Sequence, residues 1–280
     1  MVQYQLQKQR VLGYGAKGVD LKHVLRNVPD LHKIRICNSL DNALLPTDFT
    51  YTNDYIRRAG VPYPSNVVFP CSCVDEACGA NCDCMRVPIY DERGRLCTAL
   101  EYPLHECNHL CPCSADCPNR VVQRGQPIDM DIFRAAGKGW AARTNKPIEQ
   151  GEFVCRYTGE LLTNQDAEIR GGGDSLTYLF DLDKEVPHSC EPAFTVDARL
   201  YGNVSHFFNH SCAPNLGIWA VYINHLDPRL HELAFFAIRD IEAGEELTFD
   251  YCPHDIAGSA HTLHKFVCLC GAPNCRGFVF

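Results

Sequence analysis

The chain has 280 residues, of which 46% are hydrophobic and 21% charged, enough to bury the core of one large or two small domains. Its formal net charge of -8 at pH 7 argues against a partner bound mainly through phosphates, because such a partner requires a basic face. A basic peptide suits this charge better.

Eighteen cysteines are the most unusual feature of the composition. They fit either a secreted protein held by disulfides or a reduced protein rich in metal thiolates. Residues 1–18 contain no apolar core of the length that a signal peptide requires, and the chain has no stretch of about 18 uninterrupted apolar residues. We therefore expect no secretion, no membrane span, and reduced thiols that bind zinc.

Cysteine density and apolar runs divide the chain into four parts. Residues 1–66 form a cysteine-poor flank with helical and loop signals. Residues 67–125 form a cysteine-rich module with little periodicity. Residues 126–252 carry short β-prone runs separated by glycine and proline, and residues 253–280 form a short C-terminal segment. We expect a mainly β fold.

The third part contains the clearest secondary-structure signals. Strands are predicted by the β-prone runs at 153–162, 177–183, 233–238 and 246–251. One helix is predicted after residue 162, where Thr163 can cap the first turn, Asp166 lies within it, and the glycines at 171–173 end it.

Nine cysteines of the second part, Cys97 not counted, have a spacing that suits a three-zinc cluster. They are Cys71, Cys73, Cys78, Cys82 and Cys84, followed by Cys107, Cys111, Cys113 and Cys117. Three tetrahedral zinc ions need about twelve ligand places, which nine thiolates fill if three of them bridge two metals each. The C-x-C pairs fit this arrangement, because residues i and i+2 of an extended chain lie roughly 7 Å apart. The alternative is two ordinary four-thiol sites and a spare cysteine.

Three cysteines near the C-terminus, Cys268, Cys270 and Cys275, supply only three ligands of a further zinc site. The fourth ligand must come from elsewhere in the chain, and the candidates are Cys37, Cys155, Cys190, Cys212 and Cys252. Use of Cys212 would clamp the tail over the run NVSHFFNHSCAPN at 203–215. We therefore expect about four zinc ions per chain.

Four further pieces of sequence occur in order between the two cysteine groups: GKGWAA (137–142), YTGE (157–160), NVSHFFNHSCAPN (203–215) and GEELTFDY (244–251). With the flanking cysteines, they resemble the SET-domain protein lysine methyltransferases. The nine-cysteine segment, CPNRVVQRG after it and VDARLYGNVSHFFNHSC resemble the suppressor-of-variegation class, which methylates lysine 9 of histone H3. This resemblance extends from about residue 36 to the C-terminus.

The resemblance implies a SET (β-clip) fold, preceded by a pre-SET zinc cluster (67–125) and followed by a post-SET zinc segment (253–280). In this fold the segment that ends in Tyr251 threads past the NHSC segment as a pseudoknot. Phe207 and Phe208 would pack the knot, and Cys212 would join the zinc of the tail. The implied methyl donor is S-adenosylmethionine.

The resemblance also implies roles for individual residues. Cofactor contacts are implied for Lys138, Gly139, Trp140, Tyr178, Asn209, His210 and Phe278. The first three would act largely through backbone groups, and Phe278 stands where relatives often have Trp and could cover the adenine. Catalytic roles are implied for Tyr178, Tyr251, His210 and Phe249.

The expected function is methyl transfer to lysine 9 of histone H3, to the di- or trimethyl state, in nuclear heterochromatin. The expected partners are the basic H3 tail and chromatin, with no sequence-specific nucleic acid and no membrane. Asp174, Asp181 and Asp183 could attract the tail or could be solvated loop charges. Two alternatives remain: a catalytically silent SET module that binds histone tails, and a methyltransferase for a non-histone lysine.

Overall fold

The structure is a computed structural model of the whole chain. The residues that it describes are 19–20, 34–46, 48–64, 68–73, 77–79, 82, 88–97, 103–125, 127–171, 178–182, 192–252 and 266–279. Most regular structure in these ranges is β-strand, which confirms the predicted mainly β fold. In the described part, no helix is both long and apolar enough to span a membrane.

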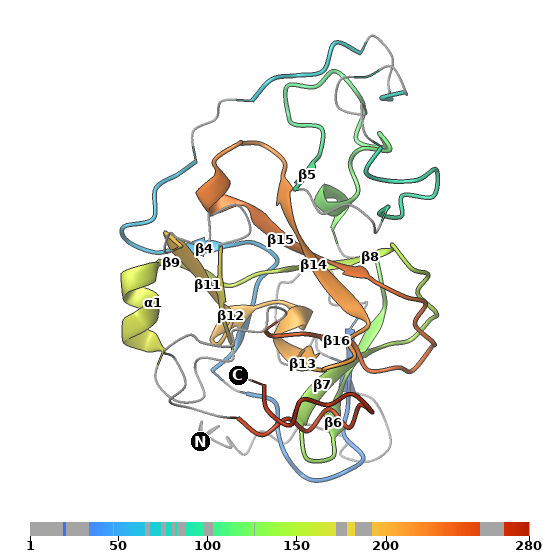
Figure 1. Cartoon of the computed structure of the whole chain (residues 1–280), viewed down its shortest axis with the longest axis vertical. Helices are drawn as coiled ribbons and strands as arrows, with labels where there is room; N and C mark the ends of the chain where they lie inside the picture. Colours follow the sequence, from blue (N-terminus) through green and yellow to red (C-terminus); the bar gives the residue numbers. More distant parts are fainter. Residues whose placement is uncertain are drawn as a thin grey trace.

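Three four-stranded sheets form the body of the molecule (Figure 1). The first has the order β1 (Val19–Asp20), β2 (Ile34–Cys37), β6 (Met130–Ala135) and β7 (Gly139–Thr144). The second has the order β10 (Leu179–Asp181), β11 (Phe194–Asp197), β9 (Glu160–Thr163) and β4 (Ile56–Arg57). The third has the order β5 (Leu104–His105), β14 (Leu216–Tyr222), β15 (Glu232–Ala237) and β8 (Phe153–Tyr157).

Two strand pairs complete the sheets found among the described residues: β3 (Thr50–Tyr51) with β12 (Tyr201–Gly202), and β13 (Asn209–His210) with β16 (Thr248–Phe249). Among the described residues, the helical elements are the 3-10 turns η4 (Val122–Arg124), η6 (Val204–Phe207) and η7 (Pro228–Leu230), and the helix α1 (Asn164–Arg170). In α1, the Thr163 side chain accepts a hydrogen bond from the Asp166 amide. This confirms the predicted cap.

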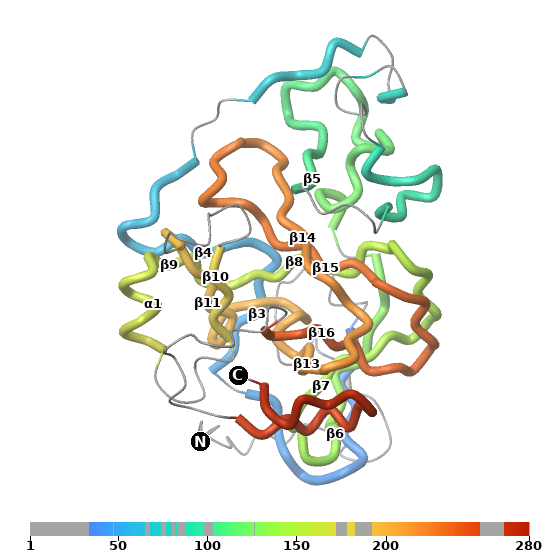
Figure 2. The backbone as a smooth tube through the Cα atoms, viewed as in Figure 1, coloured from blue at the N-terminus to red at the C-terminus, as the bar shows by residue number. Residues whose placement is uncertain are grey.

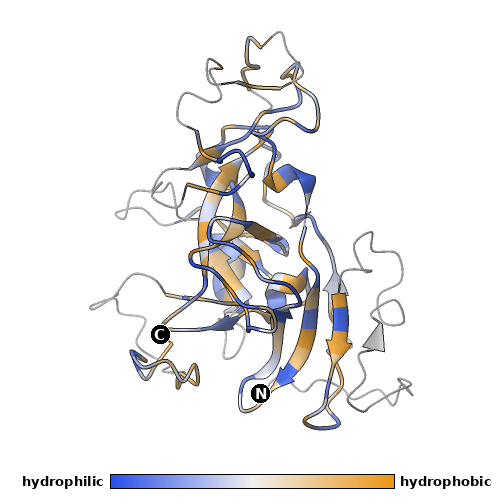
Figure 3. Cartoon of the chain, turned by 90° about the vertical axis from the view of Figure 1, so that its right-hand side faces the viewer, coloured by the Kyte–Doolittle hydropathy of each residue, from blue (hydrophilic) through white to orange (hydrophobic). Residues whose placement is uncertain are grey.

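Strand β15 joins two hydrophobic cores, because successive side chains of a strand point to opposite faces. Phe235 packs in the main core, where its ring centroid lies 5.0 Å from that of Phe249. Phe236 faces the second core, 5.5 Å from Phe153 and 6.2 Å from Tyr90. Figure 3 shows hydrophobic stretches along strands of the molecule. The same strand therefore supports both the catalytic part predicted from sequence and the cysteine module.

The described part of the flank consists of loops, as expected, and of short strands that join the β-structure of the third part; the described residues of the flank contain no helix. Strand β2 pairs in parallel with β6, β3 with β12, and β4 with β9. Figure 2 shows this segment, in blue, running from β6 along the domain toward β9. Strands of two residues are too short to show the alternation of apolar and polar residues that predicts a strand.

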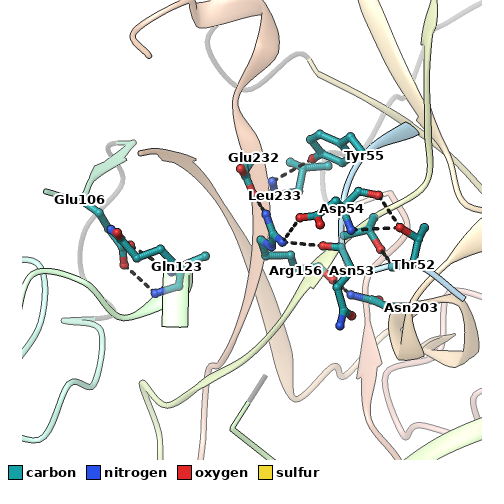
Figure 4. A network of polar contacts seen from close by, with 12 residues as sticks. Thr52, Asn53, Asp54, Tyr55, Glu106, Gln123, Arg156, Asn203, Glu232 and Leu233 are labelled. Carbon is teal, nitrogen blue, oxygen red and sulfur yellow. Dashed lines mark hydrogen bonds and ion pairs between the residues drawn. The ribbon is translucent and has the colours of Figure 1, made fainter. Parts of the chain in front are cut away.

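A partly buried guanidinium fastens the flank to the third sheet (Figure 4). Arg156 donates to the Asn53 carbonyl and to the Asp54 carboxylate, and it forms an ion pair with Glu232. The hydroxyl of Tyr55 accepts a hydrogen bond from the amide of the β15 residue Leu233. Both terminal nitrogens of the Arg156 guanidinium have acceptors, which offsets the cost of partly burying its charge. These bonds hold residues 53–54 of the flank against β8.

The cysteine module is attached through a second buried charge, Glu106. Its carboxylate accepts hydrogen bonds from the amides of Val121 and Val122 at 2.7 and 2.6 Å, and from the Tyr90 hydroxyl at 2.9 Å. Gln123 donates to the same carboxylate (Figure 4). The module therefore meets the third sheet through a fully hydrogen-bonded acid, next to the β5–β14 strand pair.

Candidate active site and zinc centres

The site is built around two segments far apart in sequence that lie side by side. Strand β13 pairs in parallel with β16, which places His210 opposite Phe249. The amide of Ser211 then donates to the Phe249 carbonyl at 3.0 Å. The Tyr251 hydroxyl donates to the Phe208 carbonyl at 2.7 Å. These contacts bring together the NHSC and DY segments, as the predicted knot requires.

A cavity of about 360 Å³ opens beside this knot. Six of the seven predicted cofactor residues line it: Lys138, Gly139, Trp140, Tyr178, Asn209 and His210. Tyr251 lines it as well, and Val267, Leu269 and Val279 of the C-terminal segment form another wall. Phe278 does not line it and has 44% of its surface exposed, although Val267, its partner in a β-bridge, does. Its predicted cover over the adenine stays a prediction.

The loop at the start of β7 presents its backbone to the cavity because its side chains are already engaged. Gly139 has a φ of 91°, a conformation that favours glycine. The Lys138 ammonium lies 2.8 Å from the Glu246 carboxylate. The Trp140 indole donates to the Leu44 carbonyl at 3.2 Å. The loop therefore offers mainly backbone groups to the cavity, and its predicted contact with the cofactor stays a prediction.

Tyr178 is positioned by two aromatic neighbours. Its ring stacks on that of His206, with centroids 4.6 Å apart and planes inclined by 11°. Its carbonyl accepts a hydrogen bond of 2.8 Å from the Tyr157 hydroxyl. Burial lowers the pKa of His206 to about 4, although a hydrogen bond with the Ala198 carbonyl opposes this shift. His206 is therefore a neutral ring at pH 7.

Tyr157 contacts the predicted site residue Tyr178 but was not itself among the site residues predicted from the sequence. It is buried, and its ring centroid lies 5.5 Å from that of Phe180 and 6.2 Å from that of Phe235. Burial raises its pKa well above the ordinary value, so its hydroxyl stays protonated and donates. The signal was present, because Tyr157 is the first residue of the YTGE motif.

Phe249 and Tyr251 complete the aromatic group next to the cavity. Their ring centroids are 4.6 Å apart, and the Phe249 ring lies 5.0 Å from that of Phe235. Burial raises the pKa of Tyr251 above its ordinary value. Its phenol is thus neutral and acts as a hydrogen-bond donor, not as a base.

The tail cysteines form a group with the dimensions of a zinc site. The sulfur atoms of Cys212, Cys268, Cys270 and Cys275 all lie within 4.8 Å of one another. The Sγ atoms of Cys212 and Cys268 are 3.8 Å apart, about the edge of a tetrahedron with Zn–S bonds of about 2.3 Å. The backbone amide of Arg276 points at the Cys212 sulfur at 3.3 Å, which suits a thiolate. The group fits a zinc ion. Of the five candidates for its fourth ligand, Cys212 is the one that lies with the three tail cysteines.

The cysteine module gathers its thiols into two overlapping groups. One consists of Cys71, Cys73, Cys78 and Cys82, and the other of Cys71, Cys78, Cys107 and Cys113. Two cysteines are common to both groups, as expected when thiolates bridge metals. Cys111 and Cys117 are buried in the same cluster, and Cys84 lies outside the described residues. No described cysteine forms a disulfide. The donor set therefore fits a shared zinc cluster better than two independent sites.

Comparison with known proteins identifies the family to which the chain belongs. A family model for the SET domain matches residues 139–252, and one for the Pre-SET motif matches 27–120. The structure of the Neurospora SET domain protein DIM-5, a histone lysine methyltransferase, is 34% identical with a TM-score of 0.72, covering 84% of this chain and 99% of that one. The chain belongs to the SET-domain family of histone lysine methyltransferases. The resemblance inferred from the motifs is thus confirmed.

Further relatives of this SET-domain protein carry the names of the suppressor-of-variegation class. Histone-lysine N-methyltransferase SUV39H2 of Xenopus tropicalis is 42% identical over 86% of this chain and 62% of its own length. Su(var)3-9 of Drosophila melanogaster is 37% identical over 93% of this chain and 43% of its own. The chain therefore spans less than two thirds of the length of these relatives. KRYPTONITE, solved with mCHH DNA, an H3(1-15) peptide and SAH, has a TM-score of 0.75 at 31% identity, covering 88% of this chain and 51% of that one.

Proposed function

We propose that this chain transfers methyl groups from S-adenosylmethionine to lysine 9 of histone H3, reaching the di- or trimethyl state, and that it acts on chromatin in the nucleus. The observation that carries the proposal is that the cavity adjoins a group of aromatic side chains, Tyr157, Tyr178, Phe249 and Tyr251. Tyr178 and Tyr251 line the cavity. The Tyr178 carbonyl accepts a hydrogen bond from the Tyr157 hydroxyl, and the Tyr251 ring packs against that of Phe249. A methyl donor in the cavity and the narrow aliphatic chain of a substrate lysine between these rings would meet at this junction.

When bound, S-adenosylmethionine supplies an electrophilic methyl group on a positively charged sulfur. Methyl transfer is an in-line displacement, so the chain must align the lysine nitrogen with that methyl group and keep water out. The buried rings of Tyr157 and Phe249 can do both, because they are rigid and apolar. The cavity volume, about 360 Å³, is in the range of small-molecule sites.

The lysine must be neutral to attack. At pH 7 only about one free lysine in two thousand is deprotonated, a cost of roughly 4.6 kcal/mol. None of the described residues that line the cavity is Asp or Glu, and the Tyr251 hydroxyl is a donor to Phe208. The proton can therefore leave to water before the site closes, while burial and the nearby positive charge keep the amine neutral.

The substrate peptide is proposed to add to the edge of β10. Among the described residues, β10 pairs with β11 alone, so its other edge can hydrogen-bond an extended peptide. Asp181 is exposed on this strand and accepts a hydrogen bond of 2.6 Å from Thr195. Asp174 and Asp183, the other predicted acids, lie outside the described residues. The formal charge of -8 favours a basic tail, and the peptide in the KRYPTONITE structure is of this kind.

The deciding experiment incubates the zinc-loaded chain with S-adenosylmethionine and each core histone, followed by mass spectrometry. We expect methylation of H3 alone, abolished in an H3 peptide with arginine in place of lysine 9. Cofactor binding without methylation of any histone would favour a silent module or a non-histone substrate. Methylation of H3 at another lysine would overturn the proposed specificity.

A further inference from the structure

Glu246 lies just before β16 and joins two walls of the cavity. Its Oε2 atom is 2.8 Å from the ammonium of Lys138. Its Oε1 atom accepts a hydrogen bond of 2.9 Å from the side-chain amide nitrogen of Asn209. The carboxylate itself does not line the cavity, whereas Lys138 and Asn209 do. Through these two residues Glu246 is linked to the wall of the cavity without lining it.

A carboxylate only accepts hydrogen bonds, so it fixes which end of the Asn209 amide faces it. The NH₂ group must point to Glu246, and it also lies 3.4 Å from the Trp140 carbonyl. Both amide hydrogens thus have acceptors on the protein. Among the described residues none donates to the Asn209 Oδ1 atom, and this atom is not buried. The oxygen is left as an acceptor at the cavity wall.

Lys138 supports the same arrangement. Its ammonium and the Glu246 carboxylate are each about one-fifth exposed, at 19% and 21%. The ion pair neutralises the lysine, so the strongest remaining side-chain feature at this wall is the partial negative charge of the Asn209 oxygen. Such an oxygen attracts an ammonium group and repels a carboxylate.

We propose that Glu246 is a positioning residue: it holds the Asn209 amide with its oxygen toward the cavity, where that oxygen accepts a hydrogen bond from the α-ammonium group of the methyl donor. The inference rests on the proposed function, because it takes S-adenosylmethionine as the ligand. It adds a role for a residue that touches neither the donor nor the lysine.

Glu246→Gln separates this role from simple support of the fold. Glutamine has one acceptor oxygen, and the charged Lys138 takes it because charge-assisted hydrogen bonds are the stronger ones. The glutamine NH₂ then faces Asn209, whose amide must turn over and present its own NH₂ to the ligand ammonium. Loss of a hydrogen bond to a charged group should weaken binding about tenfold or more.

The test uses calorimetry on the full, zinc-loaded chain with two probes: S-adenosylhomocysteine and its analogue without the α-amino group. We expect Glu246→Gln to bind the first about tenfold more weakly than wild type and the second equally well. Adding Lys138→Met to Glu246→Gln should restore binding of the first probe, because the glutamine oxygen is released to Asn209. The exposed Glu242→Gln should match wild type with both probes.

Equal losses for the two probes would show that Glu246 only supports the fold, and no loss for either would also overturn the inference. If Glu246→Gln does not fold, Glu246→Asp keeps the charge but cannot reach both partners, and its loss should again be confined to the probe with the amino group. Failure of the wild type to bind S-adenosylhomocysteine would instead contradict the proposed function itself.

Discussion

The Arg276 guanidinium holds the Asp250 carboxylate through two nitrogens, at 2.6 and 2.8 Å. Arg276 directly follows the zinc-site cysteine Cys275, and Asp250 directly precedes Tyr251. The same carboxylate lies 3.5 Å from the His210 ring. The C-terminal segment is therefore attached to the knot by a bidentate ion pair as well as by the cysteine group.

Removing this pair should loosen the wall of the cavity without removing metal. We expect Arg276→Ala to raise the KM for S-adenosylmethionine about two- to fivefold, because a partly exposed ion pair contributes about 0.5–1 kcal/mol. Arg276→Lys should recover little, since an ammonium cannot bind both oxygens in the same geometry. Steady-state kinetics and zinc analysis on both variants check this, with the exposed Arg93→Ala as control. A loss of zinc in Arg276→Ala would mean that the pair acts through the metal site.

Metal analysis should find about four zinc ions per chain. Cys212→Ser should remove about one of them, because it takes one ligand from the tail group. Cys97→Ser is the matched control, since Cys97 is exposed and belongs to none of the three cysteine groups. Chelation should abolish activity, because the segment that forms one wall of the cavity would lose its fold. Two or fewer zinc ions in carefully purified wild type would contradict the shared cluster.

Acid should destabilise the chain partly through His206. The pKa of its ring is about 4 in the folded state against an ordinary 6.5, because it is buried. The unfolded chain therefore gains a proton first as the pH falls, and stability present above pH 6.5 is lost progressively toward pH 4. Between pH 7.5 and 5.5 this amounts to roughly 1.3 kcal/mol. The free energy of unfolding, measured with denaturant at both pH values, should fall less in His206→Phe than in wild type by this amount. An unchanged pH dependence in the variant would exclude His206 as the source of the loss.

Elements with a local signal could be predicted from the sequence. The Thr163 cap and the apolar run of β15 each act within a few residues. The meeting of the NHSC and DY segments was implied by the family resemblance and not by a local signal. Contacts between distant residues could not be predicted. Glu246 meets Lys138 across 108 positions, and nothing near either residue indicates the pair. Strands β3 and β4 of the flank exist only because β12 and β9 offer them an edge.

The number of methyl groups added should depend on Phe249. This residue is 5% exposed, and its ring lies between those of Tyr251, at 4.6 Å, and Phe235, at 5.0 Å. The family resemblance places it beside the lysine amine. A phenylalanine there offers no hydroxyl, so nothing at this position hydrogen-bonds the amine or occupies the space that a methylated nitrogen needs for its next attack.

Phe249→Tyr would add such a hydroxyl next to Tyr251. We expect the wild type to reach di- and trimethyllysine, and Phe249→Tyr to stop mainly at mono- or dimethyllysine, because the new hydroxyl holds the amine and fills that space. Phe235→Tyr is the control, since it adds the same group to the neighbouring, fully buried ring. It should lower stability without changing the products. Mass spectra of one H3 peptide after long incubation decide the matter: identical product patterns for wild type and Phe249→Tyr would leave Phe249 as a core aromatic only.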